Sequence, residues 1–157
     1  MADIGQLVLE AHTRLFDQHD TSVLDEYFAE DFVEHSPLIA DDAAGLRAFV
    51  EDLSESLKYT NARVITDTAN HLVALHGQFE GIEETPFVGF DIYRVHDGKI
   101  VEHWDNLVPE AAPNPSGRTQ LDGTTDPGDE SQTEENRKTV VEFFTRTLIG
   151  GDYSGFI

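Results

Sequence analysis

The chain has 157 residues and no cysteine. This length fits one domain with a sizeable core, and the composition excludes disulfides, thiolate zinc sites and cysteine nucleophiles. Asp and Glu total 31 against 10 Lys and Arg, a formal net charge of −21. Such a negative field repels nucleic acid and anionic membranes, so we predict neither as a partner. No apolar run is long enough for a membrane helix, the N-terminus lacks the pattern of a secretory signal, and we expect a cytoplasmic protein.

The acidic residues are spread along the whole chain, and lysine is rare. This composition favours a halophilic protein, whose solvated acidic surface stays soluble in high salt because ions screen its self-repulsion. The alternative is an acidic surface that binds a cationic partner.

The first 60 residues predict helices. Apolar residues recur at helical spacing over residues 3–18, and a second, short helix over 22–29 follows the capping side chains of residues 20–22. Residues 31–35 look extended and end before Pro37. Asp41 and Asp42 then place carboxylates at the start of a third helix over 42–57.

After residue 60 the apolar period changes from 3.6 to 2, which predicts strands over 62–69, 71–80, 87–96 and 99–108. Helices followed by an antiparallel meander indicate an α+β fold. We therefore expect N-terminal helices packed in a strongly curved antiparallel or mixed sheet, a cone-shaped cystatin-like roll, with a small-molecule pocket between the two layers.

The last 50 residues differ from the first 108. Residues 1–108 form the predicted domain, residues 109–133 are a Pro- and Gly-rich linker or long loop, and residues 134–157 carry a helix over 134–149. This last segment repeats residues 8–22 at a constant offset of 132, so it either begins a second, truncated copy of the domain or matches by coincidence.

The turn at Asp97-Gly98 decides which hairpin residues meet. A three-residue loop over 96–98 with a bulge pairs Val95 with Lys99 and Asp91 with His103. It collects one set of side chains on a single face: Asp91, Tyr93, Val101, His103 and Asp105. A two-residue loop instead puts Asp91 and Tyr93 with Glu102 and Trp104. We favour the first, because it surrounds one space with carboxylates and an imidazole and leaves Ile100 and Trp104 on the other face.

These residue types suit proton transfer. An Asp on a central strand is costly to bury, and an apolar pocket raises its pKa toward neutrality, where it serves as an acid or base. His103 would orient Asp91 or shuttle its proton, and His35 lies at the expected pocket rim. We predict as pocket walls His76, Tyr27, Tyr93, Phe90 and Trp104, and as surface residues His12, His19, His71 and His96. No tight ligand spacing supports a metal, and phosphate-loop and hydrolase signatures are absent.

Two segments carry a family resemblance. Residues 27–37, Tyr-Phe-Ala-Glu-Asp-Phe-Val-Glu-His-Ser-Pro, precede a Gly-Leu-x-x-Phe helix start, and the run Gly-Lys-Ile-Val-Glu-His-Trp-Asp spans residues 98–105. Together they resemble the SnoaL-like polyketide cyclases, in the superfamily of nuclear transport factor 2 and ketosteroid isomerase, over residues 4–108.

The resemblance implies a homodimer and cofactor-free ring closure of a small hydrophobic carbonyl compound by aldol condensation. Asp105 matches the family's pocket carboxylate, Asp91 stands where the cyclases carry a His, and His35 lies near the isomerases' acid. We expect an aldol cyclase or isomerase with Asp105 as acid/base and Asp91, His103 and His35 supporting it. The alternatives are a non-catalytic binding or dimerisation module and a hydrolase or dehydratase.

Overall fold

A computed structural model describes residues 3–53, 55–126 and 128–154. Position 54 of the third predicted helix, position 127 of the predicted linker and the last three positions of the C-terminal segment lie outside these ranges. The chain divides into two compact units, residues 1–123 and 124–157. The first unit contains, in chain order, α1 (Ile4–Phe16), α2 (Val23–Tyr27), β1 (Phe28–Glu34), α3 (Ala43–Leu53), β2 (Lys58–Asp67), β3 (Leu72–Glu80), β4 (Phe87–His96) and β5 (Lys99–Pro109).

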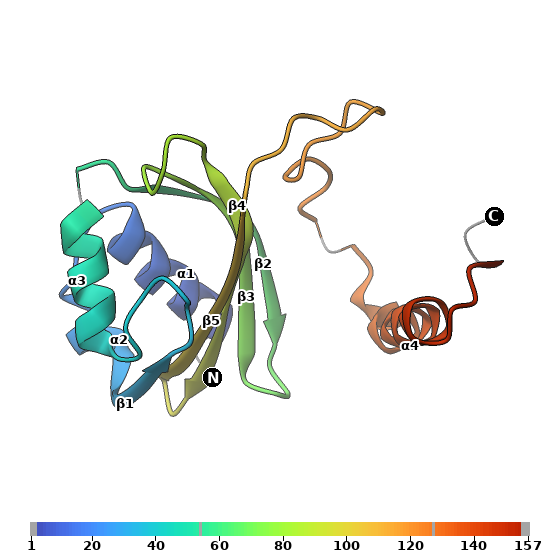
Figure 1. Cartoon of the computed structure of the whole chain (residues 1–157). Helices are drawn as coiled ribbons and strands as arrows, with labels where there is room; N and C mark the ends of the chain where they lie inside the picture. The colour runs from blue at the N-terminus through green and yellow to red at the C-terminus, as the bar shows by residue number, and fades with distance from the viewer. Residues whose placement is uncertain (1–2, 54, 127, 155–157) are drawn as a thin grey trace. The chain divides into compact units, whose positions relative to one another are not determined.

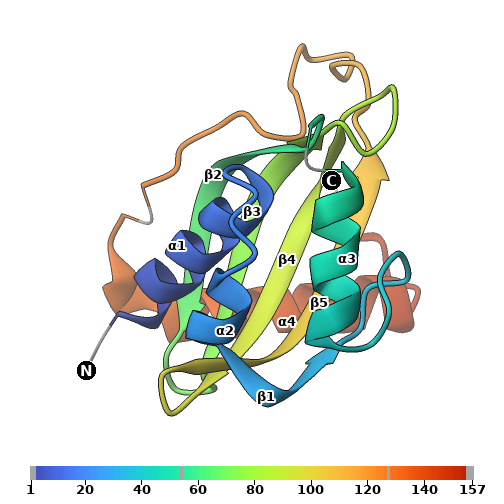
Figure 2. The same cartoon turned by 90° about the vertical axis from the view of Figure 1, so that its left-hand side faces the viewer.

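The five strands form one curved sheet in the order β1-β5-β4-β3-β2. β1 runs parallel to β5 and every other neighbouring pair is antiparallel, so the sheet is mixed. The three helices of this unit cover one face of the sheet (Figures 1 and 2). The predicted α+β fold with N-terminal helices in a curved sheet is confirmed.

Helix α1 lies against this face because its apolar residues follow the helical period. The Asp3 side chain accepts hydrogen bonds from the first backbone amides and caps the helix. Val8, Ala11 and Leu15 are fully buried and belong to one hydrophobic core with residues of β3 and β4. His12 lies on the same buried face and is 1% exposed, so its prediction as a surface residue was wrong.

Several predicted boundaries differ from the structure. Residues 28–29, predicted at the end of the second helix, begin β1, because α2 ends at Tyr27. The third helix ends at Leu53, and β2 begins at Lys58, earlier than the predicted start of the strand. Leu57 is fully buried between them, and Tyr59 pairs with Phe79 across the sheet. Leu57, which was predicted to lie in the last helical turn, is therefore buried immediately before the start of β2.

The β4–β5 hairpin has the shorter loop and also a bulge. Asp97 and Gly98 both have positive φ, 48° and 77°, as a tight two-residue turn requires. His96 pairs with Lys99, but the register then shifts and leaves Val101 as an extra residue on β5.

The predicted register was therefore wrong in its details. The structure pairs Asp91 with Asp105 and Tyr93 with His103. Ile100 is buried on the inner face, contrary to expectation. The bulge nevertheless turns His103 and Asp105 to the same face as Asp91, because it restores the alternation that the short loop alone would reverse.

Residues 110–123 belong to the first unit. The Arg63 guanidinium of β2 donates hydrogen bonds to the backbone oxygens of Leu121 and Asp122, at 3.2 and 2.7 Å.

On the outer face of the sheet Ile65, Phe90 and Ile92 are exposed. The expected homodimer stays a prediction.

The second unit contains η1 (Glu130–Gln132), α4 (Thr133–Phe144) and η2 (Thr145–Ile149). Its end reproduces the end of α1 at the offset of 132. Arg146 Nε donates to Asp152 at 2.6 Å, as Arg14 Nε donates to Asp20 at 3.0 Å. The backbone amides of both Asp residues return to the carbonyls of these arginines. That this unit begins a second copy of the domain stays a prediction.

Candidate active site

Strand β4 places a carboxylate inside the domain and apolar side chains outside it. Along the strand Asp91 and Tyr93 are buried, at 1% exposure each, whereas Phe90 and Ile92 are 42% and 37% exposed. Side chains alternate between the two faces of a strand, so burial of Tyr93 fixes Asp91 on the inner face. A buried carboxylate is costly unless it has partners, which makes its surroundings informative.

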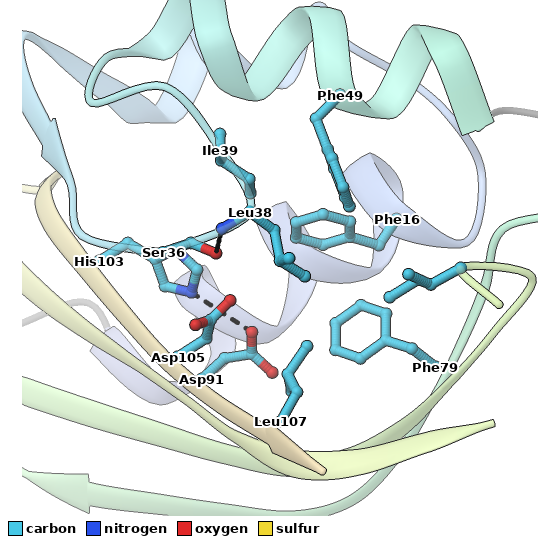
Figure 3. Close-up of a pocket in the computed structure, with 11 residues that line it drawn as sticks. Phe16, Ser36, Leu38, Ile39, Phe49, Phe79, Asp91, His103, Asp105 and Leu107 are labelled. Carbon is cyan, nitrogen blue, oxygen red and sulfur yellow. Dashed lines mark hydrogen bonds and ion pairs between the residues drawn. The ribbon is translucent and has the colours of Figure 1, made fainter. Parts of the chain in front are cut away.

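Asp91 lies at the wall of a pocket between the sheet and the helices (Figure 3). The polar lining is Ser36, Asp91, His103 and Asp105, and the rest is apolar: Phe16, Leu38, Ile39, Phe49, Phe79, Ile82 and Leu107. The free space is about 10 Å³, near the least that one water molecule needs. A larger ligand therefore requires side chains at the mouth to move, and Leu38 is 54% exposed there.

The two carboxylates of the lining come from neighbouring strands. Asp91 on β4 and Asp105 on β5 are directly opposite each other in the ladder, so their side chains emerge side by side on the inner face. Asp91 is buried and Asp105 is half-buried. Burial raises the pKa of Asp91, His103 opposes this rise, and the charges of Asp105 and Glu34 add to it.

His103 links Asp91 to a second buried acid. Its Nδ1 lies 2.8 Å from Glu34 Oε1 and 2.9 Å from Glu34 Oε2, and its Nε2 lies 3.3 Å from Asp91 Oδ1. Burial alone would lower the pKa of His103, but the hydrogen bonds and charges of Asp91 and Glu34 outweigh it and raise the pKa to about 9. His103 is therefore an imidazolium at neutral pH, held between two carboxyl groups.

Glu34 was missed as a site residue. It ends β1 and is 2% exposed, whereas its neighbours in the sequence, Val33 and His35, are both exposed. The signal was its spacing: Glu34 lies two residues after the buried Phe32, so both point to the same face. The parallel pairing of Glu34 with His103 could not be inferred from local sequence.

His35 lies on the opposite side of the sheet from the pocket lining. Its ring stacks on Trp104, with centroids 5.1 Å apart, and its Nε2 lies 3.1 Å from Glu102 Oε1. Arg94 also binds Glu102 and lies over the Trp104 ring. The structure thus joins His35 and Trp104 in an outer cluster and does not bring them to Asp91.

The other predicted pocket residues also lie elsewhere. His76 stacks on Phe90 and contacts Arg63 on the outer face. Tyr27 donates a hydrogen bond to Glu10 on the helical surface. Tyr93 is on the inner face but does not line the pocket. Its ring stacks on the His103 ring, with centroids 4.3 Å apart. Of the predicted site residues, the structure brings Asp91, His103 and Asp105 together.

Within the described part of the chain, no group of three or more His, Asp or Glu residues is arranged to hold a metal ion. In the same residues, no helix is both long and apolar enough to span a membrane.

Comparison with protein-family models matches the SnoaL-like domain over residues 9–103, which is more than half of the chain. The chain therefore belongs to the SnoaL-like family, as its sequence motifs predicted. A search of curated proteins found no match.

Several solved structures share the fold. TsrD from Streptomyces laurentii is 17% identical with a TM-score of 0.57, and the match covers 68% of this chain and 90% of the TsrD chain. Wild-type IdmH from Streptomyces antibioticus, a candidate polyketide cyclase, is 23% identical with a TM-score of 0.54, covering 66% and 91%. An epoxide hydrolase of the LEH-like type from M. tuberculosis is 15% identical with a TM-score of 0.53, covering 67% and 82%. At these identities the likeness establishes the fold alone.

Proposed function

We propose that the protein removes a proton next to a carbonyl group of a small hydrophobic molecule, as an aldol cyclase or isomerase that needs no cofactor. One observation carries the proposal: Asp91 and Asp105 lie directly opposite each other at the wall of an otherwise apolar pocket. An apolar wall selects an apolar ligand, Asp105 provides a base, and the proton shared by His103 and Asp91 provides an acid.

The half-buried Asp105 is the base. It takes the proton from the carbon next to the carbonyl, and the electrons of the broken C–H bond move into the enolate. His103 Nε2 lies 3.3 Å from Asp91 Oδ1. The proton held between these two atoms stabilises the charge on the enolate oxygen. The enolate carbon then attacks a second carbonyl, whose oxygen becomes an alkoxide and takes the proton back from Asp105, or Asp105 returns the proton to another carbon. His35 has no part in this scheme, because it contacts Trp104 and Glu102.

The test follows exchange of this proton, so it does not require the natural substrate. A panel of apolar 1,3-diketones and cyclic ketones is incubated with the protein in D₂O, and deuterium incorporation next to the carbonyl is measured by NMR. We expect enzyme-dependent exchange that Asp105→Asn lowers by about 10²- to 10⁴-fold.

Glu102→Gln is the matched control, because Glu102 is on the same strand but binds Arg94 and His35 on the other side. It should exchange at the wild-type rate. An Asp105→Asn protein with unchanged exchange would refute the assignment of the base. Ligand binding without any exchange would favour a non-catalytic binding module.

A hydrolase is the second candidate, favoured by the size of the pocket. Its free space of about 10 Å³ beside Asp91 and Asp105 suits one water molecule, which a carboxylate could activate toward an electrophilic carbon. Incubating apolar epoxides in H₂¹⁸O separates the two functions: ¹⁸O-labelled diol without carbonyl exchange would identify a hydrolase.

A further inference from the structure

A second buried histidine approaches Asp91 from the side opposite His103. His12 of α1 is 1% exposed, with its Nδ1 2.7 Å from the Tyr93 hydroxyl and its Nε2 4.0 Å from Asp91 Oδ2. Among the described residues, His12 Nε2 and Asp91 Oδ2 are the buried side-chain polar atoms that lack a hydrogen-bond partner. Two such atoms facing each other are informative, since an unsatisfied buried polar group is costly.

The protons of this cluster can be placed one by one. Burial and the nearby carboxylates raise the pKa of Tyr93, so its hydroxyl keeps its proton. Burial, together with repulsion from His103, lowers the pKa of His12 well below its ordinary value, so its ring is neutral and carries one N–H.

The Tyr93 hydroxyl selects the nitrogen that carries this proton. Within the described residues, its hydrogen bond is to His12 Nδ1, so that nitrogen accepts and the N–H lies on Nε2. The opposite tautomer would leave the Tyr93 proton without an acceptor and would point a lone pair at the Asp91 carboxylate.

We propose that His12 is a positioning residue for Asp91, with Tyr93 fixing its Nε2–H tautomer. The imidazoles of His12 and His103 then face the two oxygens of Asp91, Oδ2 and Oδ1, and hold the carboxylate plane. His103 donates to Asp91 Oδ1, and the His12 Nε2–H group faces Oδ2 from 4.0 Å, so Asp91 rests as a carboxylate and the shared proton rests on His103. The other titratable groups near Asp91 are Asp105 from β5, Glu34 from β1 and Tyr59 from β2.

This assignment deepens the role of Asp91 and rests on the proposed function for its catalytic consequence alone. The tautomer itself is measured without substrate. Long-range ¹H–¹⁵N correlation spectra of the full-length labelled protein at pH 7 report which nitrogen of each histidine carries the proton. The His12 signals are identified as those missing from His12→Asn.

We expect a neutral His12 with its proton on Nε2 in the wild type. Tyr93→Phe keeps the ring but removes the hydroxyl, and it should abolish this preference. Tyr59→Phe is the matched control: its ring lies 4.1 Å from that of His12, but its hydroxyl donates to Asn61, so the Nε2–H tautomer should persist.

A wild-type His12 that is cationic, or that carries its proton on Nδ1, would overturn the proposal. So would an unchanged tautomer in Tyr93→Phe. If the tautomer is as expected but Asp105→Asn exchanges the carbonyl proton as fast as the wild type, the proposed function fails and the positioning of Asp91 stands.

Discussion

His103 donates from Nδ1 to both carboxylate oxygens of Glu34, at 2.8 and 2.9 Å, and both side chains are buried. Such a pair requires removing two charges from water, so it is retained only where the geometry is good. It also fixes the orientation of the ring, because one nitrogen is committed to Glu34 and the other then faces Asp91.

The stability of the protein should fall as the pH rises from about 6.5 to about 9. The pKa of His103 is raised to about 9 in the fold, against about 6.5 in an unfolded chain. The stabilisation is therefore complete below the unfolded value and is lost as the pH passes the folded one, with a limiting slope of about 1.4 kcal/mol per pH unit. Urea unfolding at several pH values measures this slope, and His103→Gln should flatten it. A wild-type stability that rises over this range would contradict the charge state of His103.

Removing one member of the buried pair should cost more than removing both. Glu34→Gln leaves the His103 cation with less compensation, and we expect a loss of about 3–5 kcal/mol. The double variant with His103→Gln no longer buries that charge and should recover part of the loss. A double-mutant cycle by urea unfolding measures the coupling, and additive effects would show that the two groups do not stabilise each other.

Gly89 should tolerate no side chain. A Cβ there would lie 2.1 Å from the backbone oxygen of Asn106 on β5, and backbone cannot move aside easily. We expect Gly89→Ala to destabilise the fold by about 1–3 kcal/mol or more. In Gly98→Ala the new Cβ meets nothing within 4 Å, and only the positive φ of 77° opposes it, for about 1 kcal/mol. Equal losses in the two variants would exclude the steric cause.

Salt should stabilise the protein. A net charge of −21 repels itself in the compact state, and about 1 M KCl shortens the screening length to roughly 3 Å. The melting temperature should therefore rise between about 0.1 and 1 M KCl. Sucrose at equal osmolality separates screening from solvent exclusion, and a melting temperature that rises as much in sucrose would remove the electrostatic explanation.

Much of the fold was readable from periodicity. The change from period 3.6 to period 2 near residue 60 separated the helices from the antiparallel strands, and the turn residues Asp97 and Gly98 located the hairpin. The parallel pairing of β1 with β5 was not readable, because it joins residues about 70 positions apart and has no local signature.

The candidate site was readable only in part. Asp91, His103 and Asp105 were found because carboxylates and an imidazole on apolar strands need an explanation. His35, Trp104 and Phe90 were placed in the pocket by type, whereas the structure has them in contacts on the other face. For a strand with polar and aromatic residues in both registers, composition does not decide which face is buried.

The extra residue Val101 decides how this hairpin compares with others. Deleting it would join Ile100 directly to Glu102 and give a regular ladder with His103 and Asp105 still facing inward. In a relative that lacks this residue, the pocket residues therefore correspond to His103 and Asp105 only when the one-residue gap is aligned at Val101. A gap set between His103 and Asp105 would match pocket residues of one protein with surface residues of the other, so a true correspondence of function would be read as a loss.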